Sequence, residues 1–206
     1  MAAHTDSSDR ELLQSLQAGD EGALSELYRR SQQSVYRFAF QMCGSQTVAE
    51  DVTQEVFMVL LKEGHSFDPA RGSLNAFLIG VARNHVLRRQ RRERFYVAMS
   101  EEAQSGQDSG QTTLLVAGPL DELSRRERIE TIRRAVLALP EKYREVVVLC
   151  DLEELPYVEA AEILQCAVGT VRSRLHRARA LLLEKLRLVH EPESAPVTTR
   201  SARCFA

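Results

Sequence analysis

Four polar side chains are spaced so that a single helix could present them to DNA. They are Arg172, Ser173, His176 and Arg177. At about 100° per residue, a helix would turn them away from an apolar stripe formed by Val171, Leu175, Ala178 and Leu182. Arginine and serine on the N-terminal half of a helix can hydrogen-bond to base edges and phosphates in a major groove. The spacing therefore predicts a DNA-reading helix.

The segment before this helix has the layout of a helix-turn-helix. Ala160, Ala161 and Leu164 would form the apolar face of a first helix, and residues 165–167 would form a short turn. The hydroxyl of Thr170 could cap the second helix. A basic run is usually only a solvated surface, but here the alanine pair, the turn and the stripe coincide. That coincidence favours DNA binding.

Three further residues of the second helix have separate expected roles. Arg174 and Arg179 flank the apolar stripe, so they are expected to contact phosphate or solvent, and Arg174 is counted among the DNA-binding candidates. His176 points away from the stripe, which argues against a buried histidine or a metal ligand. It could add no more than a van der Waals contact.

A second candidate surface combines acidic and amide side chains. Asp51, Gln54 and Glu55 lie at i, i+3 and i+4, so a helix would place them on one face. An adjacent apolar face is formed by Val52, Val56 and Leu60. Such a face could dock on a basic partner or could simply be solvated.

A third candidate surface follows Gly72. The spacing of its apolar residues predicts a packed helix face, formed by Leu74, Phe77, Leu78 and Val81. The candidates for binding are its polar residues Arg83, Asn84, Arg88 and Arg91. This helix is expected to run from residue 74 to about residue 95.

Composition predicts an all-α protein. Aromatic residues make up 6% of the 206 residues, tryptophan is absent and charged residues reach 27%. The net charge of -2 and the pI of about 6.2 would argue against a nucleic-acid partner if charge were spread evenly. Basic residues instead gather in 83–94 and 172–187.

The periodicity predicts two small helical domains, each with a core of its own. Short helices are expected before residue 31, followed by helices over 31–44, 48–62 and 74–95. A polar Ser/Gly/Gln-rich stretch separates them from a second periodic block. We expect a first domain over 10–95, a flexible linker over 96–121, a second domain carrying the helix-turn-helix over 122–188 and a disordered tail over 189–206.

The sequence lacks the motifs of several common kinds of catalytic and phosphate-binding site. Motifs for phosphate loops, zinc hydrolases and nucleophile elbows are missing, so we expect no catalytic residue, no metal and no cofactor. The four cysteines are scattered without metal-ligand spacing, and Cys43, Cys150 and Cys166 are expected to be packing residues. No apolar run approaches the roughly 20 residues of a membrane span, so a cytoplasmic location without membrane insertion is expected.

Two sets of motifs resemble the extracytoplasmic-function sigma factors of bacterial RNA polymerase. LPEKYREVVVL at 139–149 and GTVRSRLHRAR at 169–179 are similar to region four of that family. AEDVTQEVF at 49–57 and FDPARGSLNAFLIGVARN at 67–84 are similar to its region two. The motifs occur in the family's order, around a variable linker.

The resemblance implies a sigma factor that binds core polymerase and promoter DNA. Region four would bind the −35 element, and region two would recognise the −10 element and open its strands. Asp51, Gln54 and Glu55 would contact the β′ clamp helices, and the β flap would be a further contact. Arginines after Gly72 would hold the −10 strand, while the loop 63–71 would form much of a pocket for a flipped base. The resemblance also allows an anti-sigma partner.

Two other functions fit parts of the sequence. A stand-alone helix-turn-helix regulator would use the N-terminal half for ligand binding or dimerisation. A helical adaptor would bind proteins only and leave its basic stripes in solvent. The acidic face and the arginine-rich helix favour the sigma factor over both.

Overall fold

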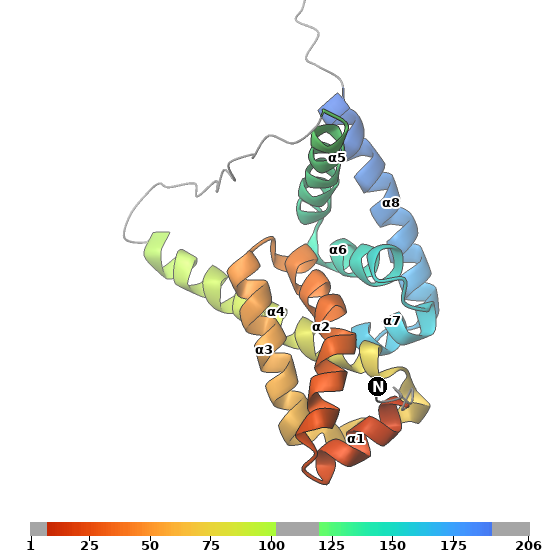
Figure 1. The fold of residues 1–206 in the computed structure, drawn as a ribbon. Coiled ribbons are helices and arrows are strands. Elements are labelled where there is room, and N and C mark those ends of the chain that lie inside the picture. The colour runs from red at the N-terminus through yellow and green to blue at the C-terminus, as the bar shows by residue number, and fades with distance from the viewer. Residues whose placement is uncertain (1–7, 102–119, 191–206) are drawn as a thin grey trace, which may run out of the picture.

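All regular elements in the described part of the chain are helices, as the sequence predicts (Figure 1). The computed structural model describes residues 8–101 and 120–190. The α-helices are α1 (Asp9–Gln17), α2 (Glu21–Cys43), α3 (Gln46–Glu63), α4 (Leu74–Glu101), α5 (Leu120–Leu137), α6 (Glu141–Val147), α7 (Tyr157–Leu164) and α8 (Val168–His190). Two 3₁₀ turns, η1 (Gly64–Ser66) and η2 (Pro69–Arg71), precede α4, and a π-helical turn, η3 (Val148–Leu152), follows α6.

Capping residues fix where the first helices begin and end. Ser8 and Glu11 form a reciprocal capping box at the start of α1. Asp20 accepts a hydrogen bond from the Gly22 amide and begins α2, which runs unbroken across residue 31 instead of restarting there. Gly44 ends α2 in the left-handed conformation with φ of 73°, a conformation that glycine adopts without strain.

The helix-turn-helix is present, but its second helix starts earlier than the sequence suggested. Gln165 ends α7 with a left-handed φ of 50°. The Ala167 carbonyl oxygen accepts hydrogen bonds from the backbone amides of Thr170, at 2.8 Å, and Val171, at 3.2 Å. The helical pattern therefore already begins at Val168. Thr170 therefore lies within the first turn of α8, and the prediction that it is the N-cap is wrong.

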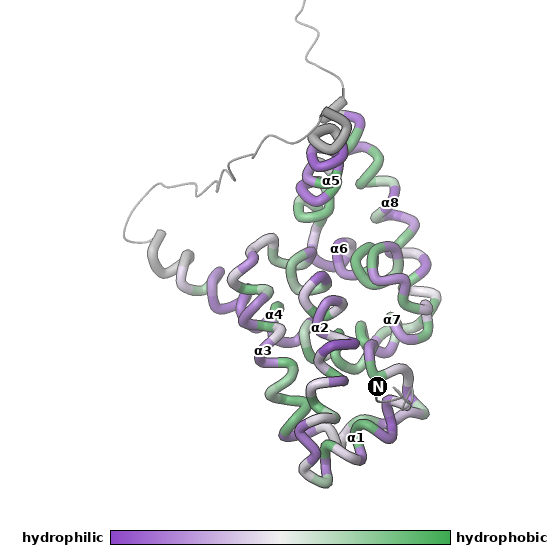
Figure 2. Tube along the Cα trace, in the orientation of Figure 1, coloured by the Kyte–Doolittle hydropathy of each residue, from purple (hydrophilic) through white to green (hydrophobic). Residues whose placement is uncertain are grey.

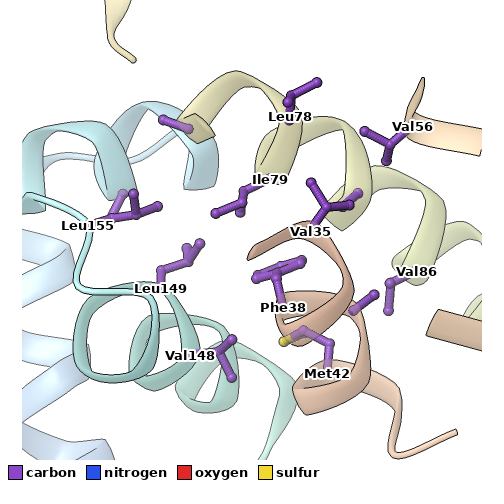
Figure 3. Close-up of a cluster of buried hydrophobic side chains, with 14 of the residues drawn as sticks. Val35, Phe38, Met42, Val56, Leu78, Ile79, Val86, Val148, Leu149 and Leu155 are labelled. Carbon is purple, nitrogen blue, oxygen red and sulfur yellow. The ribbon is translucent and has the colours of Figure 1, made fainter. Parts of the chain in front are cut away.

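The two helical segments share one core, although the sequence predicts separate ones. Figure 3 shows Phe38 of α2 beside Leu149 of η3, with Ile79 of α4 close to both. All three side chains are fully buried and belong to one continuous hydrophobic cluster. Burial of one such side chain stabilises a fold by about 1.5–3 kcal/mol. The C-terminal helices therefore pack onto the N-terminal ones through apolar contacts.

The expected linker and tail fall largely outside the described residues. Helix α4 extends past residue 95 to Glu101, and α5 begins at Leu120, so both reach into the range 96–121. Residues 102–119 and 191–206 are not described. Hydrophobic and hydrophilic residues are mixed along each described helix (Figure 2). None of these helices combines the length and the hydropathy of a membrane span.

Candidate nucleic-acid interface

Helix α8 presents the polar face that its periodicity predicts. Val171, Leu175 and Ala178 are buried, and Leu182 is half-buried. The polar candidates Arg172, Ser173, His176 and Arg177 are all exposed. The apolar stripe packs α8 against α6 and α7, which leaves the opposite face open to a partner.

One arginine of α8 is held by the protein itself. The guanidinium of Arg179 donates from Nη2 to Asp151 Oδ1 at 2.6 Å and from Nε to Asp151 Oδ2 at 3.1 Å. This bidentate hydrogen bond raises the pKa of Arg179 above its ordinary value. Arg179 therefore ties α8 to η3, instead of contacting phosphate or solvent alone as expected. Arg174 is half-buried.

The arginine-rich part of α4 lines an open groove of about 710 Å³. Asn84, Arg88 and Arg91 are exposed along it. The groove also contains two aromatic residues that the sequence analysis missed, Phe95 and Tyr96, which are 64% and 68% exposed. An aromatic pair directly after an arginine run was the signal that could have identified them, because bases of single-stranded DNA stack on exposed aromatic rings.

Arg83 differs from the other arginines of α4. Its Nε donates to Glu145 Oε1 of α6 at 2.7 Å, and its side chain is 19% exposed. Arg83 therefore differs in its surroundings from the exposed Asn84, Arg88 and Arg91, because a carboxylate of the C-terminal helices pairs with its guanidinium.

The loop before α4 lines a second cavity, of about 380 Å³. Phe67 and Phe77 meet edge to face in its wall, with ring centroids 5.6 Å apart. Asn84 also lines the cavity. The opposite wall comes from α7, with Glu159 and Ile163. The family resemblance implied a base-holding pocket in this loop, and the structure has a cavity there that residues of α7 also line.

The acidic face of α3 is partly neutralised by α4. Asp51 accepts a hydrogen bond from Arg89 Nη1 at 2.8 Å, which raises the pKa of Arg89. Glu55 contacts His85 Nδ1. Gln54 is exposed. The three residues share one face as predicted, and their partners on α4 hold the two carboxylates in place.

The described cysteines are half-buried and pack against the core. Cys204 lies outside the described residues. Burial, with a smaller contribution from Asp151, raises the pKa of the Cys150 thiol to about 11, and burial also raises the pKa of Cys43. Both shifts favour the neutral thiol.

The raised pKa of Cys150 predicts slow alkylation of the folded protein. At pH 8 iodoacetamide should modify Cys150 about a hundredfold more slowly than an ordinary thiol, because so little thiolate is present. Its rate should keep rising up to about pH 11. Mass spectrometry of the peptide containing Cys150 measures this rate, and the urea-unfolded chain is the control. Equal rates in folded and unfolded protein would contradict the prediction.

Comparison with known proteins matches the two halves of the chain to two regions of one family. Residues 27–96 match Sigma-70 region 2, and residues 129–182 match Sigma-70, region 4. Among solved structures, the fold resembles the sigma factor RpoE from Bartonella quintana, solved with the anti-sigma factor NepR, with a TM-score of 0.62 and 24% identity over 80% of this chain and 96% of the solved one. It also resembles CnrH, solved with the cytosolic domain of CnrY, with a TM-score of 0.63 and 22% identity over 88% and 99%.

Two relatives with higher sequence identity are both described as ECF RNA polymerase sigma factors. The ECF RNA polymerase sigma factor SigW of Bacillus subtilis is 31% identical over 85% of this chain and 95% of its own length. The ECF RNA polymerase sigma-E factor of Escherichia coli is 30% identical over 86% of this chain and 94% of its own length. The chain belongs to the ECF sigma factors, which bind RNA polymerase and direct promoter-specific initiation of transcription.

Proposed function

We propose that this sigma factor divides promoter recognition between two basic surfaces and docks on core polymerase through α3. Helix α8 binds the −35 element, and the groove of α4 with the adjacent loop binds the −10 element. The factor acts in the cytoplasm, where bacterial polymerase works. Members of this family are not enzymes, so the phosphodiester chemistry belongs to the polymerase. The exposed polar face of α8, backed by a buried stripe, carries the proposal.

At the −35 element, the N-terminal half of α8 enters the major groove. Arg172 and Arg177 are exposed and can each form two hydrogen bonds with a guanine edge. Ser173 and His176 lie between them on the same face, and Arg174 contacts the backbone beside it. Asp151 keeps this helix in position through Arg179.

At the −10 element, α4 supplies charge and stacking surfaces for the opened strand. Arg88 and Arg91 contact phosphates, and Phe95 and Tyr96 stack on unpaired bases further along the groove. The cavity beside Asn84, with Phe67 and Phe77 in its wall, receives a base taken out of the stack.

The polymerase contacts use both halves of the factor. Asp51, Gln54 and Glu55 dock on the β′ clamp helices, and the C-terminal helices contact the β flap. We also propose an anti-sigma partner. The complex of RpoE with the anti-sigma factor NepR supports such a partner for a protein of the same fold.

Charge reversal on α3 should weaken binding to core polymerase. Asp51→Arg and Glu55→Arg should each lower the affinity about tenfold or more, since a like charge would face a basic docking surface. Fluorescence anisotropy of a labelled factor titrated with core measures the change. Glu63→Arg, at the exposed end of the same helix, is the matched control. Unchanged affinity in both docking variants, with normal helix content, would reject the assignment.

Transcription in vitro with purified core polymerase tests the whole proposal. The factor alone should give core the ability to start at promoters whose upstream sequences were found by transcription start mapping. A stand-alone helix-turn-helix regulator would change initiation only when another sigma factor is present, and a protein-binding adaptor would give no initiation at all. Either of these results would refute the proposed function.

A further inference from the structure

Two arginines of α8 lie on one flank of the helix, beside its buried stripe. Arg172 and Arg179 are separated by almost two helical turns, so their side chains leave α8 in nearly the same direction. Ser173 and Arg177 instead lie on the side away from the stripe. Helix α7 lies beside the first part of α8 (Figure 1) and also contacts η3. The arginines of this flank therefore have protein neighbours that Arg177 lacks among the described contacts.

Asp151 of η3 occupies one end of this flank. Its two carboxylate oxygens accept hydrogen bonds from Nη2 and Nε of Arg179, at 2.6 and 3.1 Å. The Arg179 side chain is still 55% exposed, so it could reach a DNA phosphate if Asp151 did not hold it. A guanidinium that is paired with a carboxylate in this bidentate way has less attraction left for a phosphate.

The backbone around Asp151 departs from a regular helix. In η3 the Glu153 amide donates to the Val148 carbonyl at 2.9 Å, five residues back instead of four. Glu154 follows with a left-handed φ of 54°, a conformation that is unfavourable for residues other than glycine. Single π-helical turns of this kind are frequent at functional sites. Asp151 reaches Arg179 from within this turn.

Tyr157, the first residue of α7, occupies the other end of the flank. The guanidinium carbon of Arg172 lies over its ring, 6.0 Å from the centroid, which is within the range of attraction between a cation and an aromatic face. Tyr157 is half-buried and packs against the hydrophobic core, so the ring is held in place. After the larger contribution of Asp151, Tyr157 also helps to raise the pKa of Arg179. Tyr157 therefore lies near both arginines.

We infer that Tyr157 and Asp151 are positioning residues for −35 selectivity: Tyr157 orients Arg172 for a base edge, and Asp151 keeps Arg179 from contacting phosphates. This inference rests on the proposed −35 site. A guanidinium that is already oriented loses less conformational freedom when it binds, so it favours the base that fits this orientation. Phosphate contacts carry no sequence information. Both restraints therefore raise the ratio of the affinities for correct and incorrect −35 sequences.

Tyr157→Leu should lower discrimination at one −35 base pair. Core polymerase carrying each variant is titrated with labelled promoter fragments that contain the mapped −35 element or single substitutions in it. At the pair where Arg172→Ala relaxes the preference, the ratio of affinities should fall about two- to fivefold, because Arg172 loses its contact with the ring. Tyr157→Phe keeps the ring and should keep the ratio. Tyr143→Leu is the matched control, since Tyr143 is also half-buried and lies beside a cation, Lys142.

A double variant shows whether Tyr157 acts through Arg172. In the Arg172→Ala background, Tyr157→Leu should cause no further loss of discrimination. A further loss there, or unchanged discrimination in Tyr157→Leu alone, would overturn the inference. Weaker binding of every fragment by Tyr157→Phe would also overturn it, because the hydroxyl would then contact a phosphate itself.

Asp151→Asn should strengthen binding to all fragments alike. Arg179 would gain a phosphate contact, so the slope of log affinity against log salt should steepen by about 0.9. Adding Arg179→Ala should remove this change. Glu184→Gln removes one carboxylate from an exposed position of the same helix and is the matched control. An unchanged slope in Asp151→Asn, or an equal change in Glu184→Gln, would contradict the role of Asp151. If polymerase with the original factor does not distinguish −35 sequences at all, the proposed function fails instead.

Discussion

Leu175→Asp is expected to unfold the C-terminal helices and leave α1–α4 folded. Leu175 is 2% exposed within the stripe that packs α8 against α6. The substitution removes a buried leucine and places an unpaired carboxylate in apolar surroundings, at a cost of about 3–5 kcal/mol or more. That cost is comparable with the whole stability of a small domain, about 5–15 kcal/mol.

Hydrogen exchange read by mass spectrometry locates the damage. Peptides from α6 to α8 should lose their protection, while peptides from α2 and α3 should keep most of theirs, because α2, α3 and α4 pack on one another. Leu183→Asp is the matched control, since Leu183 lies on the same helix and is 59% exposed. Equal loss of protection in both variants would contradict the burial of the stripe.

Arg172→Ala together with Arg177→Ala is expected to remove −35 selectivity without unfolding the protein. Both side chains are exposed, so their loss opens no cavity. An arginine that reads guanine with two hydrogen bonds contributes about 1–3 kcal/mol, and its removal relaxes the preference at one base pair. A phosphate contact would instead weaken all promoters alike and lower the salt dependence of binding.

Transcription from a mapped promoter and from versions with single −35 substitutions separates these two roles. Arg187→Ala, at an exposed position near the end of the same helix, is the matched control and should behave like the original protein. Promoter-selective transcription by the double variant, at normal protein levels, would mean that another face of α8 contacts DNA.

Local sequence patterns predicted the helices and the orientation of their faces. The stripe of α8 was predictable because one strong period repeats over several turns, and burial of Val171 and Leu175 follows from it. The start of α8 was not predictable, because it depends on which backbone amides donate hydrogen bonds to the Ala167 carbonyl. Such details at helix ends are decided by the geometry of a short turn.

Long-range pairing was beyond the reach of sequence patterns. Arg83 and Glu145 are 62 residues apart, and neither neighbourhood distinguishes a paired charge from a solvated one. The sequence therefore predicted four equivalent polar candidates on α4, whereas the structure pairs Arg83 with the C-terminal helices. The shared core was missed for a related reason, since periodicity shows that a face is buried and does not show what covers it.

The shared core also affects how the protein emerges from the ribosome. Arg37 and Glu153, which pair at 2.9 Å beside this core, are 116 residues apart in the chain. At about 5–20 residues per second, the ribosome needs roughly 6 to 23 s to synthesise that interval. During this time the nascent N-terminal helices expose the apolar surface that η3 later covers. The N-terminal helices can therefore complete their core only after η3 has been translated.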